Sequence, residues 1–175
     1  MKLSSEEKLA LVLVGLGIIS RLLPMPPNLT MVTGVTLLAG YGIRNVWLAL
    51  LVPVAIMAIA DILLPFFKPN IIWYAGVFYT YAGMAAAVLI ARWLLAPLTT
   101  VRLIGATFLA SLTFFVLSNL GTYFEGWYGY TWDGLVACFV AALPFWQNSL
   151  IADFVSTAVA FGVFLLLKRY ALRLA

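Results

Sequence analysis

The feature that constrains this fold most is a series of six long apolar runs joined by short polar stretches. Overall, 65% of the 175 residues are hydrophobic and 9% are charged, and the mean hydropathy is +1.11. Soluble domains carry about 25% charged residues, and a chain of this size could not hide so much apolar surface from water. The sequence therefore predicts an integral membrane protein. The runs span roughly Leu9–Leu23, Leu29–Ile43, Val46–Phe67, Ile71–Leu95, Val101–Leu120 and Ser149–Leu167.

The apolar runs do not alternate with polar residues. In lipid every backbone polar group must be paired within the protein, so a span is either a helix or part of a closed barrel, and barrel strands alternate. We therefore expect an all-α, polytopic bundle of six transmembrane helices that forms one domain over residues 1–175. The first two runs are shorter than the roughly 17 residues that a full span needs. No small-residue cleavage site follows the first run, so we expect that helix to be retained.

The basic residues predict an orientation. With a cytoplasmic amino terminus, only Arg21 and Lys68 fall on the outer side, and this bias matches the positive-inside rule. Both termini are then expected in the cytoplasm, and residues 24–28, 68–70 and 119–148 are expected outside. The basic residues sit singly between spans, which argues against a nucleic-acid partner. The inner side carries Lys2, Lys8, Arg44, Arg92, Arg102, Lys168, Arg169 and Arg173.

The most distinctive outer segment, Asn119–Asn148, concentrates aromatic residues around glycines and the acids Glu125 and Asp133. Such rings suit either a membrane–water interface or the walls around a flat ligand, because each has an apolar body and a polar tip. An interfacial belt needs only one or two rings per span, so their density favours a cap over a pocket. The six rings are Tyr123, Phe124, Trp127, Tyr128, Tyr130 and Trp132.

Within this outer segment a dozen apolar residues, Trp132 to Leu143, are too few to cross the bilayer. They predict a short extra interfacial or re-entrant helix between the fifth and sixth spans, ended by Pro144.

Three charged residues fall in the outer parts of the apolar runs. Asp61, Asp153 and Arg21 each lie near the outer end of a predicted span. An ionised carboxylate in hydrocarbon costs at least a few kcal/mol, so these groups should face the bundle interior and find partners. One interpretation is an ion pair from Arg21 to Asp61 or Asp153 that fixes helix packing. The other is a polar floor for a ligand, with Asn119 and Asn148 at the same level.

Several chemistries lack the residues that they require. The chain has no histidine and a single cysteine, Cys138, so imidazole-based metal sites, triads and relays are excluded, as is an intrachain disulfide. No catalytic template is complete, so we expect no enzyme and no cofactor. A proton relay is disfavoured because the inner halves of the runs contain no acidic residue to continue a path, and only basic residues lie at their inner ends.

Several stretches resemble a widespread family of uncharacterised bacterial six-span membrane proteins. These are RLLPMPPN (residues 21–28), TLLAGYGI, AIADILLPFF, LSNLGTYF and LVACFVAALPFWQNSLIADF. That family is similar in plan to the substrate-binding S components of energy-coupling factor (ECF) transporters. S components bind vitamins from the outer side and pass them inward against a membrane coupling subunit driven by ATPases. The resemblance implies a protein of the bacterial inner membrane with such a partner.

The first hypothesis is therefore uptake of a small vitamin-like substrate, with a cobalamin-type compound as one candidate. The expected stacking walls are Trp127, Tyr128, Tyr130 and Trp132. The expected polar residues are Asp61, Asn119 and Asp153 as anchors, Arg21 as the floor, and Asn28 and Trp73 from neighbouring loops. The alternative is a non-transport scaffold or assembly subunit, in which the aromatic segment docks another membrane protein and the acids only lock helices.

Overall fold

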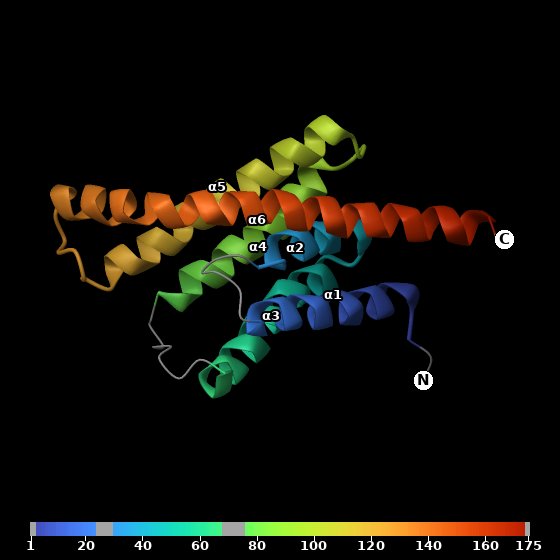
Figure 1. The fold of residues 1–175 in the computed structure, drawn as a ribbon, viewed down its shortest axis with the longest axis horizontal. Coiled ribbons are helices and arrows are strands. Elements are labelled where there is room, and N and C mark those ends of the chain that lie inside the picture. Colours follow the sequence, from blue (N-terminus) through green and yellow to red (C-terminus); the bar gives the residue numbers. More distant parts are fainter. Residues whose placement is uncertain (1–2, 24–29, 68–75, 174–175) are drawn as a thin grey trace.

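A computed structural model describes residues 3–23, 30–67 and 76–173 of the chain. This part of the chain forms six α-helices and contains no strand, so the predicted all-α fold is confirmed. Figure 1 shows the helices lying lengthwise against one another in a bundle. The helices are α1 (Ser5–Leu22), α2 (Val32–Gly42), α3 (Val46–Phe67), α4 (Val77–Leu94), α5 (Thr100–Phe124) and α6 (Trp132–Arg173).

Helix α6 corrects one prediction. The short extra helix that we expected to end at Pro144 is the first part of a single 42-residue helix that passes through this proline. A proline inside a helix removes one backbone hydrogen bond, but neighbouring helices and side chains compensate for this in membrane bundles. Helix α3 likewise contains Pro53 and Pro65. At about 1.5 Å per residue α6 is roughly 63 Å long, twice the hydrocarbon thickness of about 30 Å.

Four of the described helices are long and apolar enough to cross a membrane. They are α3, α4, α5 and α6. The remaining two helices are an 11-residue α2, which is too short to cross alone, and α1, which begins with charged residues. This set of helices indicates a membrane protein. A count of six spans stays a prediction.

The short helix α2 forms the centre of the bundle. Nine of its 11 residues are buried, and it contacts each of the other five helices. Two glycines allow this close packing: a methyl group on Gly34 would collide with the backbone of Ser156 in α6, and one on Gly40 would meet the carbonyl oxygen of Val88 in α4. Close helix approach through small residues is the usual way that membrane helices associate.

The two ends of the bundle differ in charge. The start of α1 and the end of α6 lie at one end, which we call the terminal end, and the α5–α6 connection lies at the opposite, loop end (Figure 1). At the terminal end Arg92 donates to the carbonyl oxygens of Ile43 and Arg44, each at 2.9 Å, and Arg102 donates to that of Ala96 at 2.6 Å. Cations bound to carbonyls beyond the ends of α2 and α4 complement the helix dipoles.

Candidate functional site

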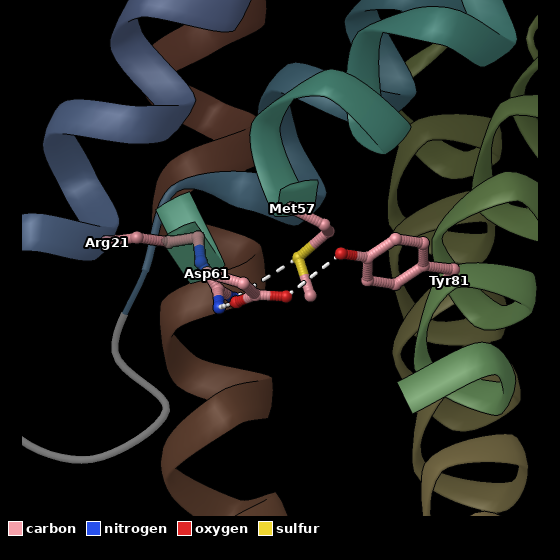
Figure 2. Close-up of polar contacts among 4 residues, drawn as sticks. All are labelled: Arg21, Met57, Asp61 and Tyr81. Carbon is pink, nitrogen blue, oxygen red and sulfur yellow. Dashed lines mark hydrogen bonds and ion pairs between the residues drawn. The ribbon is translucent and has the colours of Figure 1, made fainter. Parts of the chain in front are cut away.

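An ion pair joins α1 to α3 near the loop end of the bundle. The Nη2 atom of Arg21, in the last turn of α1, lies 2.5 Å from Oδ1 of Asp61 in α3. Both side chains are largely shielded, with exposed fractions of 19% and 15%. The sequence allowed Arg21 to pair with either intramembrane acid, and in the structure it pairs with Asp61. Figure 2 shows this contact.

Two further side chains complete this cluster, which we call the Arg21 cluster. Tyr81 of α4 donates its hydroxyl proton to the second carboxylate oxygen of Asp61, at 3.0 Å. Met57 lies one turn before Asp61 on α3, and its sulfur is 3.2 Å from Nη1 of Arg21 (Figure 2). Both oxygens of Asp61 are thus hydrogen-bonded, and three helices contribute to one polar contact within apolar surroundings.

Arg21 is less completely paired than Asp61. A guanidinium group carries five N–H donors. One nitrogen contacts a carboxylate, one contacts only a thioether sulfur, which is a weak acceptor, and the buried Nε has no hydrogen-bond partner among the described residues. Arg21 therefore retains capacity for another acceptor.

The second intramembrane acid, Asp153 of α6, is held in a different way. Only 8% of its surface is exposed, and its carboxylate is hydrogen-bonded by the side chains of Ser111 in α5 and Thr33 in α2. Trp146 donates from Nε1 to the hydroxyl oxygen of Ser111 at 3.1 Å. Within the described residues no cationic side chain forms an ion pair with Asp153. The carboxylate is held by neutral hydroxyls.

Hydroxyl groups from neighbouring helices also occupy the start of α2. The backbone N–H of Gly34 donates to the hydroxyl of Ser156, at 3.2 Å, and that hydroxyl donates to the carbonyl oxygen of Asp153, at 3.1 Å. On the α1 side, Ser20 accepts from the backbone N–H of Met31 at 3.2 Å. The first N–H groups of a helix have no partner within it, and here other helices supply two of those partners. The Asp153 region is thus joined to the buried helix.

The remaining predicted polar residues are placed apart from these two clusters or lie outside the described residues. The amide of Asn119 donates to the carbonyl oxygen of Phe115 on its own helix, at 2.7 Å. The thiol of Cys138 approaches the Asn119 carbonyl oxygen at 3.5 Å. Asn28 and Trp73 lie outside the described ranges.

The aromatic segment between α5 and α6 packs largely on itself. Tyr130 donates its hydroxyl proton to the carbonyl oxygen of Phe124, at 3.1 Å, and Tyr123 donates to that of Thr131, at 3.3 Å. The four rings expected to form stacking walls are all exposed, and the values for Trp127, Tyr130 and Trp132 are 74%, 70% and 75%. In the described structure these rings face outward. This exposure is typical of an interfacial belt.

The sequence pointed to Arg21 but not to the uncharged partners around the two acids. A single hydroxyl or sulfur in an apolar run is common in membrane helices and does not by itself indicate a site. For this reason the sequence did not point to Met57, Tyr81, Thr33 or Ser111. A signal existed in the spacing of hydroxyl residues inside the runs, such as Thr33 with Thr36. Hydroxyls that recur on one helix face inside a membrane span have to find partners across helices.

The comparisons with known proteins identify a family. A search of curated proteins and a search of solved structures return no match. A family model covers residues 2–174, almost the whole chain. The chain therefore belongs to DUF6580, a family of unknown function.

Proposed function

We propose that the protein is a solute-binding membrane protein that serves uptake, in the manner of ECF transporter S components. The solute is a vitamin-like micronutrient that carries a hydrogen-bond acceptor, such as a carboxylate, phosphate or carbonyl group. It enters at the loop end of the bundle, which faces outward when both termini are in the cytoplasm of a bacterial inner membrane. An energy-coupling membrane subunit with ATPases is the expected partner.

The observation that carries this proposal is the incomplete pairing of Arg21. Polar groups inside a membrane bundle are expensive, and a cluster that serves only to lock helices would be expected to satisfy its donors. The buried Nε of Arg21 has no partner among the described residues, and its Nη1 faces a sulfur. A guanidinium held on one side by a carboxylate offers its remaining donors to an anionic or carbonyl group.

The surroundings of Arg21 support a small ligand. The cluster combines a charged pair, a phenol and a thioether from α1, α3 and α4, and it lies near the end of those helices. Ligand sites are mostly apolar with a few placed polar groups, and such sites occur between the helices of bundles. The aromatic residues of the α5–α6 connection lie at the same end of the bundle (Figure 1).

Native mass spectrometry of the protein, purified gently from its host membrane, tests this proposal. We expect the wild type to carry one small molecule per chain and Arg21→Gln to lose it. Lys168→Gln is the matched control, because it also removes one positive charge but lies exposed near the end of α6. Tyr81→Phe is a milder second variant that removes one hydroxyl from the cluster, and we expect it to weaken retention. A wild type that carries no small molecule would contradict the proposal.

A scaffold or assembly subunit is the second candidate function, and the exposure of the aromatic segment favours it. Trp127 and Trp132 each expose about three quarters of their surface, and Trp and Tyr are enriched in the anchors of protein interfaces. Under this alternative a second membrane protein co-purifies with the chain. Trp127→Ala combined with Trp132→Ala then removes that partner, whereas Arg21→Gln does not.

A further inference from the structure

We infer that the space where α2, α5 and α6 meet binds one small monovalent metal cation of the sodium class, with Asp153 as its charged ligand. This inference goes beyond the proposed uptake function. The cation site is built from different residues than the Arg21 cluster. It can therefore be tested whether or not a solute binds to the Arg21 cluster.

Buried hydroxyl oxygens on α2 and α6 lie at the level of Asp153 and one turn beyond it. The Asp153 carboxylate already contacts the hydroxyls of Thr33 and Ser111. Two more hydroxyl oxygens, those of Thr36 and Thr157, are buried and have no hydrogen-bond partner among the described residues. Their side chains are 0% and 2% exposed. A buried hydroxyl without a partner is unfavourable, which indicates a missing ligand.

The spacing of these groups along α2 and α6 is helical. Thr33 and Thr36 are three residues apart on α2, and Asp153 and Thr157 are four apart on α6, so each pair shares a helix face. The two helices run in the same direction from the Thr33–Asp153 contact to the packing of Tyr41 against Phe161, whose ring centroids are 5.6 Å apart. Thr157 therefore lies one turn beyond the carboxylate on the face of α6 that meets α2, and Thr36 lies at the corresponding level of α2.

The charge and the chemical type of these side chains favour a monovalent metal cation. Carboxylate and hydroxyl oxygens suit hard cations, and one carboxylate with neutral hydroxyls neutralises a single positive charge. A divalent ion would leave a net charge buried among apolar helices, which is costly. Thiol and imidazole ligands are missing from this set, so it does not suit a softer transition metal.

The close packing of α2 on α6 limits the size of the cation. At Gly34 the α2 backbone packs directly on the backbone of Ser156 and Thr157, and an added methyl group would collide with it. Asp153 itself is 8% exposed. Helices in such close contact exclude an organic ammonium group, so a cation at this position has to be a bare metal ion. A sodium-class ion would thus join α2 to α6 at the start of the central helix.

Thermal unfolding of the full chain in detergent, in sodium chloride and in choline chloride at equal ionic strength, tests the inference. We expect sodium to raise the unfolding temperature of the wild type by about 3 to 6 °C for each tenfold increase in its concentration above the dissociation constant. Asp153→Asn should abolish the shift. Asp61→Asn is the matched control and should keep it, because Asp61 is paired with Arg21.

Threonine variants keep the test decisive if Asp153→Asn does not fold. Thr157→Val and Thr36→Val preserve shape and remove one oxygen each, and each should weaken sodium binding by about tenfold or more. Equilibrium binding of radioactive sodium should reach one ion per chain. Equal unfolding temperatures of the wild type in the two salts, or a shift of full size in Asp153→Asn, would overturn the inference.

Discussion

Asp61 and Asp153 are the same residue type in the same bundle, yet the structure stabilises them by opposite means. Asp61 lies against Arg21, whose positive charge offsets its own, and it also accepts a hydrogen bond from the Tyr81 hydroxyl. Asp153 is more deeply buried and contacts only neutral hydroxyls within the described residues. Asp61 is thus complete as an ion pair, whereas Asp153 has no positive partner among the described residues.

Burial explains why this contrast matters. A charge removed from water loses several kcal/mol of solvation, and only a close opposite charge with good hydrogen bonds offsets this. At Asp61 the opposite charge comes from Arg21, which keeps N–H donors without a partner. At Asp153 the group without an opposite charge is the carboxylate, a hydrogen-bond acceptor. The two clusters are therefore suited to ligands of opposite character, an acceptor at the first and a cation at the second.

The largest effect on stability is expected from breaking the ion pair on one side. Arg21→Ala leaves Asp61 with Tyr81 as its remaining partner, and we expect a loss of about 3 kcal/mol. The double variant Arg21→Ala with Asp61→Asn should recover most of this loss, since no unpaired charge remains. Chemical unfolding in detergent micelles measures both, and equal stabilities of the single and double variants would show that the pair contributes no electrostatic coupling.

The next largest effect is expected at the α2–α6 contact that encloses Asp153. Gly34→Ala places a methyl group against the Ser156 backbone, which cannot move as a side chain can, and we expect a loss of about 2 to 3 kcal/mol. Gly15→Ala is the matched control, because nothing lies within 4 Å of an added methyl group there. Alanine has a higher helix propensity than glycine, so Gly15→Ala should stabilise the protein by up to about 1 kcal/mol. Equal effects at the two glycines would contradict this close packing.

The two acids themselves should respond differently to neutralisation. In sodium-free buffer Asp61→Asn leaves Arg21 without a carboxylate and should cost about 2 kcal/mol. Asp153→Asn removes a charge that has no opposite partner in the described structure, so stability should stay within about 1 kcal/mol of the wild type. Thermal unfolding of both variants in choline chloride compares them directly. A larger loss at Asp153 than at Asp61 would reverse the comparison.

The smallest effect is expected where water competes with the contact. At the start of α1 Ser4 and Glu7 form a capping box: the backbone N–H of Ser4 donates to Glu7 at 2.7 Å, and the backbone N–H of Glu7 donates to the Ser4 hydroxyl at 3.2 Å. The backbone bond from Ser4, and then its side chain, hold the pKa of Glu7 below its usual value. A lowered pKa contributes stability above the ordinary pKa of Glu7, and that contribution disappears as pH falls through the lowered value.

Ser4→Ala removes the hydroxyl half of this box. We expect a slight loss of stability near neutral pH and a smaller difference from the wild type in acid, where Glu7 is protonated in both proteins. The measurement is the unfolding temperature of the two proteins from pH 7 down to about pH 3. A difference that grows in acid would contradict the assigned role of Glu7.

The helical class of the fold could be read from the sequence, because apolar runs without alternation leave the backbone no other way to pair in lipid. The sequence did not reveal where a helix continues through a proline. Pro144 is a helix breaker in water, but in α6 the helix continues through it, because surrounding helices determine whether the lost hydrogen bond is tolerated. Sequence alone does not specify those neighbours.

The site was predictable only in its charged members. Arg21, Asp61 and Asp153 stand out because charges inside apolar runs are costly. Their partners depend on how far each helix is rotated and shifted against the next, and the sequence does not contain that information explicitly. For this reason both acids remained candidates for Arg21, and the contacts of Asp153 with Thr33 and Ser111 emerged only in the folded chain.

We propose that the two acids serve two separate sites, with the solute at Asp61 and Arg21. The most direct test of this proposal is the amount of co-purified small molecule in Asp61→Asn and Asp153→Asn, measured by native mass spectrometry in sodium-containing buffer. We expect Asp61→Asn to lose most of the solute found in the wild type and Asp153→Asn to retain it. Loss of the solute from Asp153→Asn, with full retention by Asp61→Asn, would show that the solute site is not at Asp61 and Arg21.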